Sequence, residues 1–156
     1  VAMQRSSVQI RMVSNLQHQH EVKNASLSNL NSVYTQMLLN GNLQNKILIE
    51  TQAEYVSALN TDPDLKVAPP LDIYTIYAND LKAPVFSAKS IDKVVVSARH
   101  LPAPNTSSHY LKAVQGCGSG CSAMHLAVNA DVTAKNGATR SAQEIGLRRI
   151  VPGATN

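Results

Sequence analysis

The run "SAMHLAVNADVTAK" at residues 122–135 constrains the fold more than any other stretch, because its apolar and polar side chains alternate. Alternation with a period of two is the pattern of a β-strand whose sheet has one buried face and one solvated face. A sheet of that kind needs a second layer to cover its apolar side. The side chains expected on the buried face are Met124, Leu126, Val128, Ala130 and Val132.

Further runs complete the predicted sheet, which spans residues 71–152. "KNG" at 135–137 is a hairpin turn signal, and "SAQEIGLRRIV" at 141–151 returns as the partner strand. "LDIYTIYA" at 71–78 and "DKVVVSARHL" at 92–101 are rich in β-branched and aromatic residues, which favours two more strands. We therefore expect an antiparallel sheet in the second half of the chain.

The layer that can cover this sheet is helical and occupies the first part of the chain. We predict a helix over residues 1–59 with a break near residue 41, where "NGN" places Gly41 in the left-handed position that follows a helix end. "NTDPD" and "APPLD" then end the helical pattern, since proline cannot continue a helix. The apolar side chains expected to hold this helix on the sheet are Leu27, Leu30, Tyr34 and Met37.

Length and composition fit one extracytoplasmic domain. A chain of 156 residues can bury a sizeable core, so we predict a single domain over residues 1–156. Its fold class is α+β: a long N-terminal amphipathic helix packed on an antiparallel β-sheet. Only 15% of the residues are charged, so Ser, Asn, Gln and Thr must cover most of the surface.

The two cysteines, Cys117 and Cys121, stand close together in "QGCGSGC", and three interpretations compete. A zinc site would need further ligands such as His109 or His125, and no second cysteine pair exists. A redox pair normally has two intervening residues and opens a helix, whereas three separate these cysteines and a strand pattern follows. A short structural disulfide fits best, because the surrounding glycines allow a tight turn, and it implies an oxidising compartment.

No arrangement of residues predicts catalysis, and we expect neither an enzyme nor a cofactor or metal. His18 and His20 stand two apart, so a helix points them to different faces. The net charge of +4 raises the question of nucleic acid, but the basic residues are scattered and Arg148–Arg149 is the only adjacent pair. With no Trp and one Phe, stacking platforms for bases are scarce, which argues against direct nucleic-acid binding.

The chain opens with "VAMQRSSVQIRMVSN", a helical segment with no capping residue before its first apolar side chain. We therefore expect it to be the exposed part of a longer helix. The opening resembles the PilX-like minor pilins of type IV pili. In that family an apolar helix emerges from the membrane, and the stretch that follows contains an Arg, small hydroxyl residues, a Gln, a basic residue and a Met-x-x-Asn motif. The positions that carry this resemblance are Arg5, Gln9, Arg11, Met12 and Asn15. MshP-like, PilV-like and competence-type minor pilins stay open as alternatives.

The resemblance implies a structural function. Such a protein is anchored in the inner membrane by the preceding helix, with a periplasmic domain, and later joins the extracellular pilus fibre. Its partners are the other minor pilins, the major pilin and a pilus-tip adhesin, and together the minor pilins prime pilus assembly. Val8, Met12 and Leu16 would face neighbouring helices of the bundle. The alternative is an extracellular DNA- or ligand-binding competence-type pilin, with the sheet or the cysteine turn as the contact.

Overall fold

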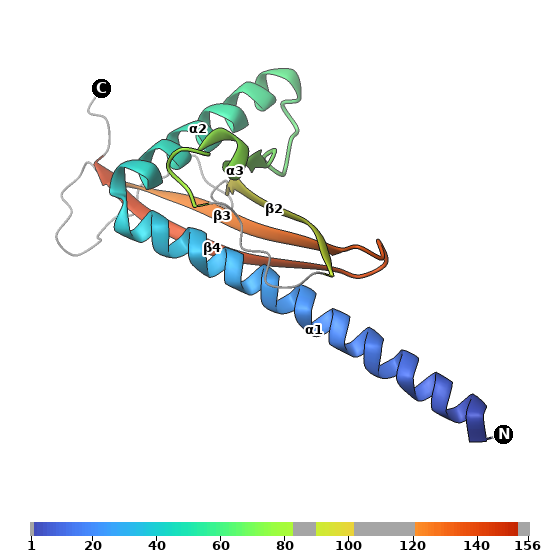
Figure 1. Ribbon diagram of the computed structural model, residues 1–156. Helices are drawn as coiled ribbons and strands as arrows, with labels where there is room; N and C mark the ends of the chain where they lie inside the picture. Colours follow the sequence, from blue (N-terminus) through green and yellow to red (C-terminus); the bar gives the residue numbers. More distant parts are fainter. Residues whose placement is uncertain (1, 83–89, 102–120, 153–156) are drawn as a thin grey trace.

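The computed structural model describes residues 2–82, 90–101 and 121–152. The fold is α+β, with two long helices against one antiparallel sheet (Figure 1). This confirms the predicted fold class at the level of a long amino-terminal helix and an antiparallel sheet. The elements in chain order are α1 (Ala2–Leu39), α2 (Gly41–Thr61), β1 (Leu71–Asp72), α3 (Ile73–Ile76), β2 (Ile91–His100), β3 (Cys121–Ala134) and β4 (Arg140–Pro152).

The break between α1 and α2 falls at Asn40, next to the predicted position. The Asn40 N–H donates to the Gln36 carbonyl at 3.0 Å, while the Asn40 Oδ1 accepts from the Leu43 N–H at 3.1 Å. Asn40 therefore ends one helix and caps the next. The prediction for Gly41 is wrong: it is the first residue of α2, and the positive-φ glycine of the described chain is Gly137. Because the new helix begins at once, no left-handed residue is needed between the two.

The four strands lie in the order β1-β2-β3-β4, and each neighbouring pair is antiparallel. The β3–β4 hairpin has the predicted position, with Thr133 opposite Arg140 and Gly137 at φ 66° in the turn. The left-handed backbone at Gly137 costs little because glycine has no Cβ. Strand β2 also agrees with the predicted run, since it begins and ends within one residue of it.

The predicted strand at 71–78 is largely wrong. Only Leu71 and Asp72 pair with β2, and the chain then enters the one-turn helix α3. The Asp72 carboxylate accepts hydrogen bonds from the backbone N–H groups of Tyr74 and Thr75 at 3.1 and 3.2 Å. This capping interaction satisfies backbone donors that a strand would have paired across the sheet, and it overrides the β-propensity of the aromatic and β-branched side chains.

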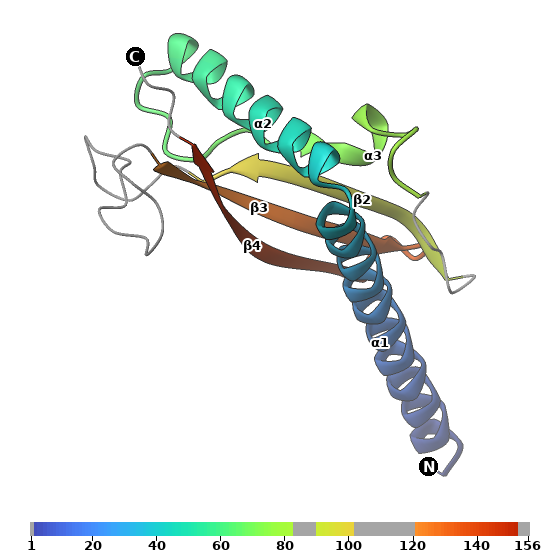
Figure 2. The same cartoon turned by 90° about the vertical axis from the view of Figure 1, so that its left-hand side faces the viewer.

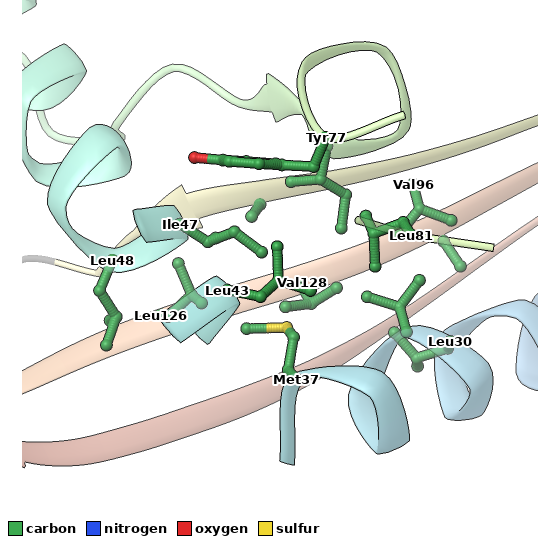
Figure 3. Close-up of a cluster of buried hydrophobic side chains, with 14 residues drawn as sticks. Leu30, Met37, Leu43, Ile47, Leu48, Tyr77, Leu81, Val96, Leu126 and Val128 are labelled. Carbon is green, nitrogen blue, oxygen red and sulfur yellow. The ribbon is translucent and has the colours of Figure 1, made fainter. Parts of the chain in front are cut away.

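The core lies between the sheet and the layer formed by α1, α2 and α3 (Figures 2 and 3). Leu126, Val128 and Ala130 of β3 point into it and are at most 1% exposed, as the alternation predicted. Met37 of α1 and Ile47 of α2 meet them from the helical layer (Figure 3). The two long helices therefore cover the same face of the sheet, and their packing fixes the direction in which α1 leaves the body of the protein.

Candidate functional site

The amino-terminal part of α1 continues past the sheet, away from the rest of the described chain (Figures 1 and 2). All residues from 8 to 17 are exposed and His18 is partly buried; counted from residue 8, Val22 is the first residue with no exposed surface. Figure 1 shows this protruding segment as a direct continuation of the packed part of α1. We call residues 8–17 the free segment and take it as the candidate site.

The free segment exposes an unusual number of large apolar side chains. More than half of the surface of each is accessible, although each would favour burial by about 1.5–3 kcal/mol. Large apolar side chains exposed close together on one segment make that segment a candidate interaction site. The residues concerned are Val8 at 55%, Ile10 at 66%, Met12 at 64%, Val13 at 63% and Leu16 at 55% exposed.

The structure leaves Val8, Met12 and Leu16 available for the helix-to-helix packing that was predicted for them, without showing a partner. Ile10 and Val13 were not predicted. The helical period would have identified them, because they stand three residues apart and share a side of the helix that the first set does not occupy. Sequence inspection missed them because it followed a single stripe.

The packed half of α1 holds the free segment on a rigid base. The Ser26 hydroxyl donates to the Ala130 carbonyl of β3 at 2.7 Å, and the neighbouring Ala25 is 1% exposed. These small side chains let the helix approach the sheet closely. Nearer the exit of the helix, the Glu21 carboxylate accepts from the Ser90 hydroxyl and lies 3.8 Å from the His18 Nδ1. The helix is therefore fixed at several points before it protrudes.

The four residues predicted to hold α1 on the sheet differ in how deeply they are buried. Leu30 and Met37 lie in the core, and Tyr34 is half-buried. The prediction is wrong for Leu27, which is 37% exposed. Leu27 lies about 120° around the helix from the centre of the buried face, because each residue turns the helix by about 100°. Sequence inspection missed most of that face, which also holds Val22, Ala25, Ser26, Asn29 and Val33.

The family-motif positions lie in the protruding part of α1. Gln9, Arg11, Met12 and Asn15 are exposed, and the side chain of Arg5 lies outside the described residues. Cys117 also lies outside the described residues, while Cys121 begins β3. The disulfide between them stays a prediction.

The face of the sheet that points away from the helices is polar. Arg99 of β2 reaches across β3 to Glu144 of β4, with Nη2 and Oε2 3.0 Å apart, and Ala127 beneath this bridge is buried. Arg140 pairs with Asp131 on the same face. Two arginines of this surface therefore already face carboxylates, while Lys93 of β2 and Arg148 of β4 add further basic side chains to the same face.

Within the described ranges, no three His, Cys, Asp or Glu side chains gather closely enough to hold a metal ion. His100 stacks on Tyr55, with 5.4 Å between ring centroids, so this histidine contributes to packing between β2 and α2. Of the helices described, none combines the length and the apolar character needed to cross a membrane.

Tyr77 provides a test of the packing between α3 and α2. Burial raises the pKa of Tyr77, and the Glu50 and Asp80 carboxylates raise it further because they oppose a second negative charge. The unfolded chain loses the phenolic proton of this tyrosine above pH 10, because an ordinary tyrosine pKa is about 10. The folded protein keeps that proton at the same pH. The contribution to stability is therefore full below about pH 10 and falls as the pH rises above that value.

We expect the free energy of unfolding, measured with urea at intervals from about pH 8 to pH 11, to fall at the alkaline end. Tyr77→Phe should make this fall shallower, because phenylalanine has no proton to lose. An identical alkaline slope in both proteins would contradict the assignment to Tyr77.

Comparison of the chain with protein-family models, with curated proteins and with solved structures finds no match.

Proposed function

We propose that this protein is a structural subunit of a type IV pilus, a minor pilin of the PilX-like kind. The observation that carries the proposal is the free segment of α1, where five large apolar side chains are exposed on a helix whose other half is fixed to a sheet. A subunit of a helical bundle needs this arrangement, because its helix must bury apolar side chains against other chains while its sheet stays outside. Four positions that carry the resemblance lie in the same segment: Gln9, Arg11, Met12 and Asn15.

In this proposal the helix joins a bundle with the other minor pilins and the major pilin. The minor pilins together prime pilus assembly and form a tip complex that supports an adhesin. The chain is held in the inner membrane by a helix preceding Val1 and exposes its domain to the periplasm before the fibre is extruded. The packing residues are Val8, Met12 and Leu16, whose exposure in the isolated protein supports this role.

The proposal is tested by deleting the full-length gene and counting surface pili by electron microscopy and by the amount of pilin sheared from the cells. We expect pili to be strongly reduced and to return when the gene is supplied from a plasmid. Normal piliation together with normal twitching and DNA uptake in the deletion strain would refute the proposal.

A further inference from the structure

The outer face of the sheet, which points away from the helices, carries a polar depression of about 350 Å³. Pockets for small molecules range from about 300 to 1,000 Å³, so this depression suits a ligand of one or two rings. Side chains of β2 and β3 form most of its lining, because alternation turns every second residue of a strand outward. These residues are Lys93, Val95 and Ser97 of β2, and Asn129, Asp131 and Thr133 of β3.

The pairing of β2 with β3 fixes the positions of these side chains. Ser97 lies opposite Asn129, and Lys93 lies opposite Thr133 at the end of the sheet that holds the β3–β4 hairpin. Neighbouring strands are about 4.8 Å apart, and successive side chains on one face of a strand about 6.7 Å. The polar groups are therefore already in place, and a ligand that binds them needs little ordering of the backbone.

The neutral polar side chains of the depression are available to a ligand. Ser97, Asn129 and Thr133 are half-buried, and within the described ranges their side chains form no hydrogen bond. Hydroxyl and amide groups both donate and accept hydrogen bonds, so they can bind the hydroxyl groups of a ligand. None of the described lining residues is aromatic, so the depression offers no ring on which a nucleic-acid base could stack.

The charges of the depression leave one cation without a partner. Arg140 of β4 also lines it, and its Nε donates to both carboxylate oxygens of Asp131, at 2.7 and 2.8 Å. Lys93 is exposed and forms no ion pair with a described residue. Two cations and one carboxylate leave one positive charge. A single carboxylate on the ligand matches that charge, whereas a phosphate monoester carries about −1.5 to −2.

We propose that this depression binds an acidic sugar, whose carboxylate pairs with Lys93 and whose hydroxyl groups bond to Ser97, Asn129 and Thr133. Half-buried Val95 lies among these polar groups and can contact the apolar side of the sugar ring. The inference goes beyond the proposed function, because the depression and the free segment are separate surfaces.

The test titrates the ¹⁵N-labelled 156-residue protein with glucuronic acid and follows its backbone amide signals by NMR. We expect the amides of Ser97, Asn129 and Thr133 to shift with a millimolar dissociation constant, and those of α1 to stay in place. Glucose, which lacks the carboxylate, and acetate, which lacks the hydroxyl groups, should each bind about fivefold more weakly. No shift at about 100 mM glucuronic acid, or equal binding of either comparison ligand, would overturn the inference.

The residue roles are tested by substitution. Lys93→Gln should weaken glucuronic acid binding about fivefold and leave glucose binding unchanged, because only the ion pair is lost. Asn129→Ala should weaken the binding of both sugars, since both use its hydrogen bonds. Lys23→Gln is the matched control, because Lys23 is an exposed lysine of α1 on the other side of the sheet. Unchanged affinity in Lys93→Gln, or an equal loss in Lys23→Gln, would overturn the inference.

A DNA duplex of about ten base pairs tests for phosphate in place of the sugar carboxylate. We expect the duplex not to displace glucuronic acid from the depression at the same ionic strength. Displacement by the duplex at a lower concentration than glucuronic acid itself requires would overturn the inference. The proposed function is decided separately, since it depends on the loss of pili when the gene is deleted.

Discussion

Replacing Val8 with threonine and Met12 with glutamine in the full-length protein is expected to abolish surface pili and leave the fold intact. Both substitutions nearly preserve side-chain shape but remove the apolar character of one stripe of the free segment. If both side chains become buried in the bundle, their loss costs about 3 kcal/mol, or about a hundredfold in association. Because both are more than half exposed in the isolated protein, its free energy of unfolding should change by less than about 0.5 kcal/mol.

Leu39→Gln is the matched control for this experiment. Leu39 belongs to the same helix and is 83% exposed, but it lies at the opposite end of α1, beside the turn into α2. We expect cells with this variant to make normal numbers of pili, counted by electron microscopy. Equal piliation in the control and in the Val8/Met12 double variant would show that the free segment is not an assembly surface.

Leu30→Ala is expected to destabilise the protein by about 2–5 kcal/mol, whereas Leu27→Ala should cost less than about 1 kcal/mol. The two leucines stand one turn apart in α1, yet Leu30 is 5% exposed in the core and Leu27 is 37% exposed. Removing Leu30 leaves a cavity against the sheet, while removing Leu27 leaves solvent in its place. Urea unfolding of the two variants measures the difference.

The Leu27 and Leu30 pair also tests which face of α1 meets the sheet. Similar losses for the two variants would contradict the buried face that the structure assigns to α1. Wild-type secondary structure, checked by circular dichroism, is required of both variants before their free energies are compared.

The strands β2, β3 and β4 could be predicted because their side chains carry the signal themselves. In β3 the alternation places Val128 inward and Asn129 outward, whatever packs on either face. The hairpin turn was equally local, since Gly137 supplies the left-handed backbone that the turn requires. These features depend on neighbours within a few residues, and sequence inspection reads such neighbours directly.

The features that were missed depend on competition between interactions. In "LDIYTIYA" the side chains favour a strand, but the Asp72 carboxylate caps two backbone N–H groups and turns the chain into α3. At residue 41 the glycine suggested a left-handed stop, but the Asn40 side chain begins a new helix in its place. In both cases a short polar side chain accepted hydrogen bonds from backbone N–H groups and began a helix. This effect exceeded the conformational preference of the residues around it.

The candidate site could be predicted in position but not in extent. Helical spacing singled out Val8, Met12 and Leu16, but periodicity cannot distinguish an apolar side chain that meets a sheet from one that meets solvent. The helical period also places Ile10 and Val13 near one another, but their exposure follows only from the structure, in which α1 continues past the end of the sheet.

By itself the sequence determined the class of the fold: a helical first part, and alternating strands whose one apolar face needed cover. It did so because the spacing of apolar side chains along the chain is a local property, which stays the same however the helices and strands are arranged in space. Tertiary structure alone decided which face of α1 is buried and where that burial stops. Ser26 and Ala25 set the close approach to β3, the sheet has an end, and beyond that end the same helix leaves its apolar side chains exposed.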